Sequence, residues 1–390
     1  MTDNWDAIVV GGGPAGSAMA ARLARLSHRV LLLDRAEFPR DKPCGECLSP
    51  GAVRQLAELG VLDKVRAAGA VSLSGWKIVP ARAHSFIGEF TAGEEGFALP
   101  RSTLDSILLE SARTAGVEVR TGERVTDLVR AGRAVTGVRT GRAGRSIRAR
   151  LVVGADGIRS VVVRRLGLLR RSPRLRKLAL TGHVRGVEGL GGRGELHVRA
   201  WGCVGVAAVG GDLANVTVVV NGGEAGRVGG DREQFFDTVL ASEPRFADCA
   251  RDGGVLATGP FDWPTRSAVA DGAMLVGDAA GYYDPFTGQG MYRAMKGAAM
   301  AAEVADNALR TNDPSARALR KYDRDRRREF GPGIRVQHLV EAFVARPAMM
   351  KIAAHQLGGH TAAANALVAV VGDVAPVRSL LRPGLLFSGA

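Results

Sequence analysis

A glycine-rich turn near the start of the chain constrains the fold more than any other feature of the sequence. Residues 5–10 (Trp-Asp-Ala-Ile-Val-Val) are predicted to form a short buried strand, and residues 11–16 (Gly-Gly-Gly-Pro-Ala-Gly) follow as the turn. Residues 17–26 have the spacing of a helix, and a second apolar run at residues 30–33 ends at Asp34. The order strand, glycine turn, helix, strand, acid is typical of the dinucleotide-binding unit of α/β proteins.

The residue types of this unit have separate physical roles. Gly11 permits the tight turn, Gly13 lets the backbone approach a pyrophosphate, and Gly16 lets the helix pack closely on the strand. The free N–H groups and the positive dipole end of the helix favour phosphate groups. Asp34 stands where a carboxylate can accept hydrogen bonds from ribose hydroxyls. The sequence therefore predicts binding of an adenine dinucleotide.

The length and composition limit the classes of protein to which the chain can belong. A chain of 390 residues allows two domains or one large domain. No apolar run reaches the roughly 18 residues that a membrane-spanning helix needs. The first strand begins without room for a signal peptide, so we expect a cytoplasmic protein. Four cysteines in a chain of this length do not suggest a disulfide framework.

The net charge of +14 comes mostly from arginines scattered along the chain. The densest cluster, residues 324–328, alternates with acidic residues and is interpreted as a solvated helix face. We therefore expect no nucleic-acid partner, and peripheral contact with anionic lipid is a secondary alternative. The oligomeric state is expected to be a monomer or a homodimer.

Two further motifs follow the glycine turn. Ala155-Asp156-Gly157 comes directly after an apolar strand, and Gly277-Asp278 comes after another. With the turn at residues 11–16, they resemble the flavoprotein monooxygenases of the para-hydroxybenzoate hydroxylase type, whose layout geranylgeranyl reductases and flavin-dependent halogenases share. The resemblance covers residues 5–310. It implies FAD as the cofactor and NAD(P)H as an electron donor that binds without a second dinucleotide fold.

The expected fold class is α/β with a discontinuous domain arrangement. Residues 1–75, 101–175 and 265–325 are expected to form a Rossmann-like FAD-binding domain. The alternating pattern of residues 177–264 indicates antiparallel strands, so residues 76–100 and 176–264 are assigned to a substrate domain with a mixed or antiparallel sheet. Residues 326–390 are assigned to a helical C-terminal segment.

The resemblance also implies which residues contact FAD. The glycine turn lines the pyrophosphate, Asp34 holds the adenosine ribose, and Arg101 reaches the flavin nucleotide. Val125 offers backbone contacts to adenine, Asp156 lies near FAD and the nicotinamide path, and Asp278 binds the ribityl chain. The segment from Pro285 to Met291 runs along the isoalloxazine, where N–H groups at a helix start stabilise negative charge on the reduced ring. The full expected set is Gly11, Gly13, Pro14, Ala15, Gly16, Asp34, Arg35, Cys44, Gly45, Arg101, Val125, Asp156, Asp278, Pro285, Gly288, Gln289, Gly290 and Met291.

The loop at residues 43–50 carries a CxxC sequence, Cys44-Gly45-Glu46-Cys47. A redox dithiol would need a thioredoxin-like context, and a zinc site would need two further ligands; the sequence shows neither, so no metal is expected. The sequence Pro-Cys-Gly followed by Leu-Ser-Pro resembles the geranylgeranyl reductase branch, in which this cysteine lies near the flavin. Cys44 is therefore the candidate catalytic residue. Glu46 stands where that branch often has glycine.

The main functional hypothesis is an NAD(P)H-dependent FAD monooxygenase that hydroxylates a lipophilic aromatic or polyketide-like small molecule. In this hypothesis the cofactor carries the chemistry and the protein supplies orientation and a dry cavity. One alternative is a flavin reductase of isoprenoid double bonds, in which hydride comes from N5 of the flavin and Cys44 lies close by. Another is a membrane-associated flavoprotein subunit of a biosynthetic complex, suggested by the basic charge and the apolar C-terminal helices.

Overall fold

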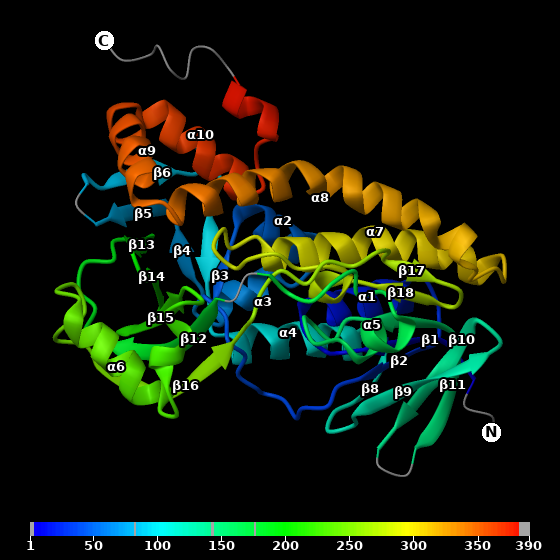
Figure 1. The fold of residues 1–390 in the computed structure, drawn as a ribbon. Helices are drawn as coiled ribbons and strands as arrows, with labels where there is room; N and C mark the ends of the chain where they lie inside the picture. Colours follow the sequence, from blue (N-terminus) through cyan, green and yellow to red (C-terminus); the bar gives the residue numbers. More distant parts are fainter. Residues whose placement is uncertain (1–3, 82, 142–143, 175–176, 382–390) are drawn as a thin grey trace.

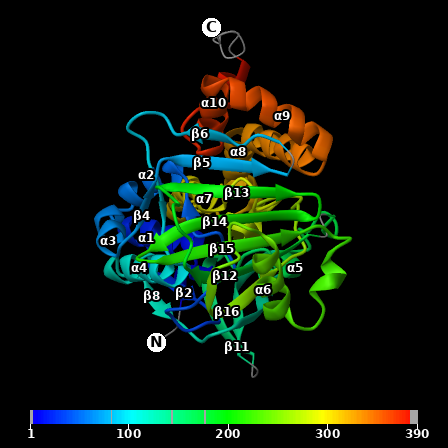
Figure 2. The ribbon, with the colours of Figure 1, turned by 90° about the vertical axis from the view of Figure 1, so that its left-hand side faces the viewer.

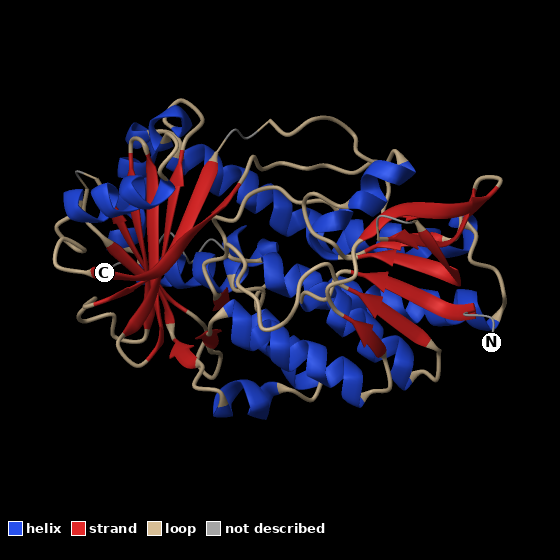
Figure 3. Cartoon of the chain, turned by 90° about the horizontal axis from the view of Figure 1, so that it is seen from below, coloured by secondary structure: helices blue, strands red, loops and turns tan. Residues whose placement is uncertain are grey.

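Two large β-sheets stand at opposite ends of the molecule, with helices between them (Figure 3). The structure is a computed structural model, and it describes residues 4–81, 83–141, 144–174 and 177–381. The expected C-terminal segment, residues 326–390, is therefore described only to Leu381, and residues 382–390 lie outside the described part.

The first sheet has a parallel centre built from buried apolar strands. Strands β18, β11, β1, β2 and β8 run parallel in this order, and β17 pairs antiparallel with β18. Strands β9 and β10 form a hairpin that pairs with the first half of β11. Its strands are β1 (Asn4–Val10), β2 (Val30–Leu33), β8 (Glu118–Arg120), β9 (Val125–Ala131), β10 (Ala134–Thr140), β11 (Arg145–Gly154), β17 (Val269–Ala270) and β18 (Ala273–Leu275).

Three helices pack together beside this sheet: α1 (Pro14–Arg25), α4 (Arg101–Thr114) and α7 (Gly290–Arg310) (Figure 1). Helix α1 begins at Pro14, three residues before the start predicted from the apolar spacing. Gly13 is its N-cap, and Pro14 occupies the first helical position, where its fixed φ suits a helix and its missing N–H costs nothing. The glycine turn and the helix start are therefore one continuous structure.

The second sheet has seven strands in the order β16, β12, β15, β14, β13, β5 and β6 (Figure 2). All neighbours are antiparallel except β13 and β5. Helix α6 (Arg232–Ser242) covers one face, where Phe236 is fully buried, and η1 (Ala225–Val228) precedes it. The strands are β5 (Gly75–Pro80), β6 (Phe86–Glu89), β12 (Leu178–Arg185), β13 (Arg193–Arg199), β14 (Gly202–Gly210), β15 (Leu213–Val220) and β16 (Ala250–Thr258).

A small third sheet joins β3 (Cys47–Leu48), β7 (Gly96–Ala98) and β4 (Val71–Leu73), next to α2 (Pro50–Glu58) and α3 (Leu62–Ala67). Strand β7 falls in a range assigned to the substrate domain, yet it pairs with the strand that follows the Cys44 loop. Both backbones come close because Gly96 faces the carbonyl oxygen of Leu48. This sheet therefore supports the loop that carries Cys44.

The C-terminal part is helical: α8 (Ala316–Val344), α9 (Pro347–Gly359), α10 (Thr361–Val371) and η3 (Val377–Leu381). The expected domain boundary between residues 325 and 326 lies inside α8. Ion pairs four residues apart, such as Lys321 with Asp325 and Asp323 with Arg327, support this stretch of the helix. Among the described residues, no helix has both the length and the apolar character needed to cross a membrane. The predicted α/β fold with two sheets and C-terminal helices is confirmed.

Candidate functional site

A cavity of about 900 Å³ opens at the carboxyl ends of β1, β2 and β11. Ligands bind at such strand ends in open α/β sheets because the loops there are free to form a site. Six of the residues expected to contact FAD line the cavity: Gly11, Gly13, Asp34, Arg35, Val125 and Asp156.

The three glycines of the turn differ in what surrounds them. Gly11 has a φ of +106°, and a Cβ there would lie 2.5 Å from the carbonyl oxygen of Ala155. A Cβ at Gly16 would overlap the carbonyl oxygen of Gly11. A Cβ at Gly13 would meet only the Arg40 side chain, at 3.6 Å. The fold thus requires glycine at two positions, and Gly13 leaves space beside the cavity.

Two carboxylates face this space. Asp34 accepts backbone N–H bonds from Gly12 at 2.6 Å and from Ala36 at 2.8 Å, which fixes its orientation. Asp156 accepts from the N–H of Val161 through Oδ2 at 2.6 Å, whereas its buried Oδ1 has no partner among the described residues. Burial raises the pKa of Asp156. A buried oxygen without a partner beside a cavity is suited to a donor on a ligand, such as a hydroxyl group.

The cavity has more cations than acids. Seven arginine and lysine residues line it against four acidic residues, so its net charge favours an anionic group such as a diphosphate. Lys42 lies within this set, and burial lowers its pKa. Sequence reasoning found only Arg35, because the cations come from three separate segments. The cations are Arg35, Arg40, Lys42, Arg124, Arg159, Arg164 and Arg165.

The three sequence motifs meet at this place. Gly11 lies against Asp156, since a Cβ on Gly11 would be 2.9 Å from its Cα. The 3-10 helix η2 (Gly277–Ala280) lies on the start of α1, and a Cβ on Gly277 would be 2.7 Å from the Cβ of Ala15. Asp278 lines a small adjoining cavity that shares Arg159 with the large one. Pro14, Ala15 and Gly16 form the buried first turn of α1 behind the cavity wall.

The expected isoalloxazine segment forms the entry to α7. Pro285 and Gly288 form a turn closed by a 3.0 Å backbone bond, and Gln289 is the N-cap of α7. A Cβ at Gly288 or at Gly290 would meet no atom within 4 Å, so both glycines border open space at a helix N-terminus. That N-terminus is a site for negative charge. Met291 is buried in the main core.

Arg101 does not line the large cavity. Its guanidinium makes a bidentate bond to Asp105 at 2.9 and 2.7 Å, and Arg40 joins the same carboxylate at 3.3 Å. Although burial opposes its charge, Asp105 and Cys44 raise the pKa of Arg101. Arg101 thus stands between the cation-lined cavity and the Cys44 loop.

The Cys44 loop lies against the second sheet. Asn215 on β15 donates to the carbonyl oxygen of Cys44 at 3.1 Å, and Gly45 faces Thr217 on the same strand. Cys44 and Cys47 are both free thiols, and burial raises the pKa of Cys47. Cys44 is therefore placed between the FAD-binding domain and the sheet of the second domain.

Glu46 links the two domains directly. It is buried, and its φ of +58° lies in the left-handed region, which glycine adopts more readily than other residues. Its Oε1 accepts the backbone N–H of Arg101 at 2.7 Å, and its Oε2 lies 2.7 Å from Nε2 of His183 on β12. The hydrogen bond with Glu46 raises the pKa of His183. In the sequence, Glu46 was notable only because the resemblance leads us to expect glycine at this position. No sequence pattern indicated His183 as its partner.

An apolar cluster lies beyond this loop, on the sheet face opposite to α6. It brings together strands of the second sheet and the segment that precedes α7, through Tyr282 and Phe286. We refer to it as the inner apolar cluster. It consists of Ala179, Cys203, Val219 and Phe261, with Leu196, Tyr282 and Phe286 packed against them.

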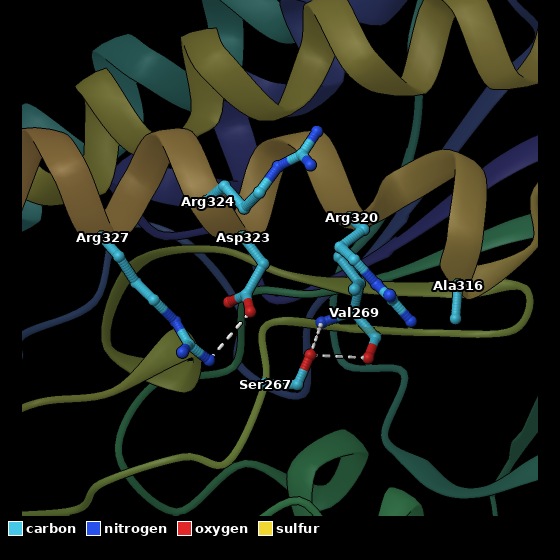
Figure 4. Close-up of a pocket in the computed structure, with 7 residues that line it drawn as sticks. All are labelled: Ser267, Val269, Ala316, Arg320, Asp323, Arg324 and Arg327. Atoms are coloured by element: carbon cyan, nitrogen blue, oxygen red, sulfur yellow. Dashed lines mark hydrogen bonds and ion pairs between the residues drawn. The ribbon is translucent and has the colours of Figure 1, made fainter.

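A separate hollow of about 340 Å³ lies between α8 and the edge strand β17 (Figure 4). Asp323 accepts the N–H of Ala268 at 3.0 Å and pairs with Arg327 at 2.9 Å, while Arg324 points away from this carboxylate. The hollow shares no lining residue with the large cavity. These contacts attach α8 to the sheet edge.

The fold and the cavity define a flavoprotein with a Rossmann-like FAD-binding domain. The family model described as "FAD binding domain" matches residues 4–188. Digeranylgeranylglycerophospholipid reductase 1 of Methanococcoides burtonii is 35% identical over 346 residues, which cover 85% of this chain and 81% of that protein. The chain therefore belongs to the family of FAD-dependent oxidoreductases that includes this reductase.

Solved structures agree on the fold. A geranylgeranyl bacteriochlorophyll reductase-like protein of Thermoplasma acidophilum has a TM-score of 0.81 at 22% identity, covering 99% of this chain and 98% of that one. A myxobacterial chondrochloren halogenase has a TM-score of 0.79 at 26% identity, covering 86% and 82%. The predicted resemblance to this group of flavoproteins is confirmed, and the protein is an FAD-dependent oxidoreductase.

Proposed function

We propose that the protein reduces carbon–carbon double bonds of an isoprenoid lipid. This is the alternative of the sequence analysis, and the comparisons favour it over hydroxylation, because the reductase of M. burtonii shares 35% identity across most of both chains. One observation carries the proposal for this chain. The Cys44 loop lies between the FAD-binding domain and the second sheet, and the sheet face that it contacts also carries the inner apolar cluster.

The residues of the site have distinct tasks in this proposal. Asp34, Gly13 and Asp156 would hold the dinucleotide part of FAD, and the α7 N-terminus would offer its N–H groups to the ring system. FAD supplies hydride transfer when bound. The inner apolar cluster holds the prenyl chain and excludes water from it. We assign to the Cys44 thiol the task of holding a proton near the reacting carbon. We propose NAD(P)H as the electron donor, which is what the resemblance to the flavoprotein monooxygenases implies.

The test is anaerobic turnover of the FAD-loaded protein, reduced with dithionite, on digeranylgeranylglyceryl phospholipid. We expect mass spectrometry to show the gain of one H₂ for each double bond reduced. Cys44→Ser should slow reduction of the lipid while FAD still binds, and Cys249→Ser, on the far side of the second sheet, should not. Labelled oxygen from O₂ in an aromatic substrate, with no hydrogenated lipid, would overturn the proposal in favour of monooxygenation.

A further inference from the structure

A fourth cavity, of about 540 Å³, lies far from the glycine turn in the fold, between α9 and the turn that joins β5 to β6. Its lining residues are Ala83, His84, Lys351 and His355. Lys351 and His355 are four residues apart and therefore project from the same face of α9. His84 faces them from the β5–β6 turn. None of these residues lines the cavity of the FAD site.

The polar groups of this cavity are nitrogen donors. The Lys351 side chain ends in an ammonium group with three N–H donors, and each imidazole has an N–H group to donate. All three side chains are exposed, and no ion pair within the described ranges involves them. A cluster of one ammonium and two imidazoles without carboxylate partners suits a phosphate group.

The floor of this cavity is apolar. Ala83 packs on a cluster that joins the edge of the second sheet to α9 and α10, which we call the outer apolar cluster. Figure 1 shows α9 lying over β5 and β6, at the end of the molecule where this cluster sits. Its buried members are Phe86, Val198, Met350, Ala354 and Ala364.

The outer and inner apolar clusters are continuous. Leu196 and Phe286 pack against both of them, so apolar contacts run from the polar cavity to the side of the sheet that faces the Cys44 loop. Only Met350 and Ala354 are buried among the residues of α9, so this helix is held on the sheet by few side chains. Ile352, 63% exposed, and Ile87, 42% exposed, add apolar surface on α9 and on β6.

We infer that Lys351, His355 and His84 bind the phosphate group of the lipid whose prenyl chain reaches the flavin along the two apolar clusters. The inference rests on the proposed function, which it extends by placing the head group. The phosphate of such a lipid matches the nitrogen donors of the cavity, and its branched hydrocarbon chain matches the two apolar clusters that follow.

The test compares two lipids that differ only in the phosphate. Binding of geranylgeranyl phosphate and of geranylgeraniol, each in neutral detergent micelles, is measured by calorimetry on the FAD-loaded full chain. The native protein should bind the phosphate compound about tenfold more tightly, the size expected for a charge-assisted hydrogen bond. Lys351→Glu should remove this preference and leave geranylgeraniol binding unchanged, and Lys351→Arg should keep most of it. Lys321→Glu on α8 is the matched control.

The outcomes test the proposed head-group site independently of the proposed reaction. Equal binding of the two lipids by the native chain, or an unchanged preference in Lys351→Glu, overturns the site even if prenyl lipids are reduced. A preference that depends on Lys351 supports the site even if no double bond is reduced, which would count against the proposed function alone. Inorganic phosphate that competes at the affinity of the lipid would assign the cavity to free phosphate and overturn the lipid head group.

Discussion

Gly13 and Gly16 are both glycines of the same turn, but they differ in whether the fold leaves room for a Cβ atom. Gly16 has no room for a Cβ because the carbonyl oxygen of Gly11 occupies that position. Gly13 is the N-cap of α1, with extended backbone geometry that any residue adopts, and its open side faces the cavity. The fold therefore demands glycine at residue 16 but not at residue 13, where we expect the demand for glycine to come from the bound cofactor.

This difference gives a paired prediction. Gly16→Ala should destabilise the protein by about 3 kcal/mol or prevent folding, because α1 must move away from β1. Gly13→Ala should fold with a nearly native melting temperature and bind FAD about tenfold more weakly, because the methyl group occupies the approach of the pyrophosphate. Thermal unfolding of the apoprotein and titration with FAD measure the two effects. Normal FAD affinity in Gly13→Ala would contradict the assignment of the turn.

At the scale of elements, the turn after α10 connects the C-terminal helices to the cofactor side. Asp373, with a φ of +62°, accepts hydrogen bonds from Ser49 at 2.9 Å and from Gln289 at 2.6 Å. The N–H of Gly51 donates to Gly372 at 3.0 Å. One turn thus holds both the end of the Cys44 loop and the N-cap of α7. Burial raises the pKa of Asp373 to about 7.

The raised pKa of Asp373 makes this attachment sensitive to pH. The unfolded chain releases the proton near the ordinary value of 3.8, while the folded chain keeps it to about 7. Stability from this group therefore falls as the pH rises from about 4 to about 7 and stays low above that. Asp373→Asn keeps the left-handed backbone and both hydrogen-bond partners but does not ionise.

We expect Asp373→Asn to be more stable than the native chain by about 1–3 kcal/mol at pH 8, and by less at pH 5. Urea unfolding at the two pH values measures the difference. Asp325→Asn, on the exposed side of α8, is the control and should show little pH dependence. A gain that is the same at both pH values would contradict the titration of Asp373.

At the scale of the whole molecule, one amine ties the two domains to the C-terminal helices. Lys177 directly precedes β12 of the second sheet, and it lies 3.0 Å from Asp284, next to the isoalloxazine segment, and 3.1 Å from Glu341 on α8. The Lys177 side chain is 11% exposed and that of Asp284 is 2% exposed. Although burial opposes the charge, the two carboxylates raise the pKa of Lys177.

Removing this amine leaves two carboxylates without their cation. Lys177→Gln should lower the free energy of unfolding by about 3 kcal/mol, because the buried Asp284 loses its charge partner. Lys321→Gln removes the exposed pair with Asp325 and should change it by less than about 0.5 kcal/mol. Chemical denaturation of both variants measures the contrast, and equal small effects would show that the Lys177 ion pairs do not stabilise the contact between the domains.

The sequence by itself determined the features that depend on neighbouring residues. The glycine turn, the strands on either side of α1, and the Asp156 and Asp278 motifs follow from local spacing, because each role needs a particular residue type within a few positions. The resemblance to FAD-dependent flavoproteins rests on the same local motifs, and so does the α/β fold class. For the functional choice, the Pro-Cys-Gly sequence around Cys44 indicated the reductase branch as the alternative.

The tertiary structure alone decided which distant segments meet. The pairing of β7 with β3, the bond between Glu46 and His183, and the cation set around the large cavity join residues that are tens to hundreds of positions apart. No local pattern specifies such contacts, because they depend on how whole sheets and helices pack. The continuity of the two apolar clusters through Leu196 and Phe286 is of this kind, since buried apolar residues have the same sequence pattern whichever neighbours they contact.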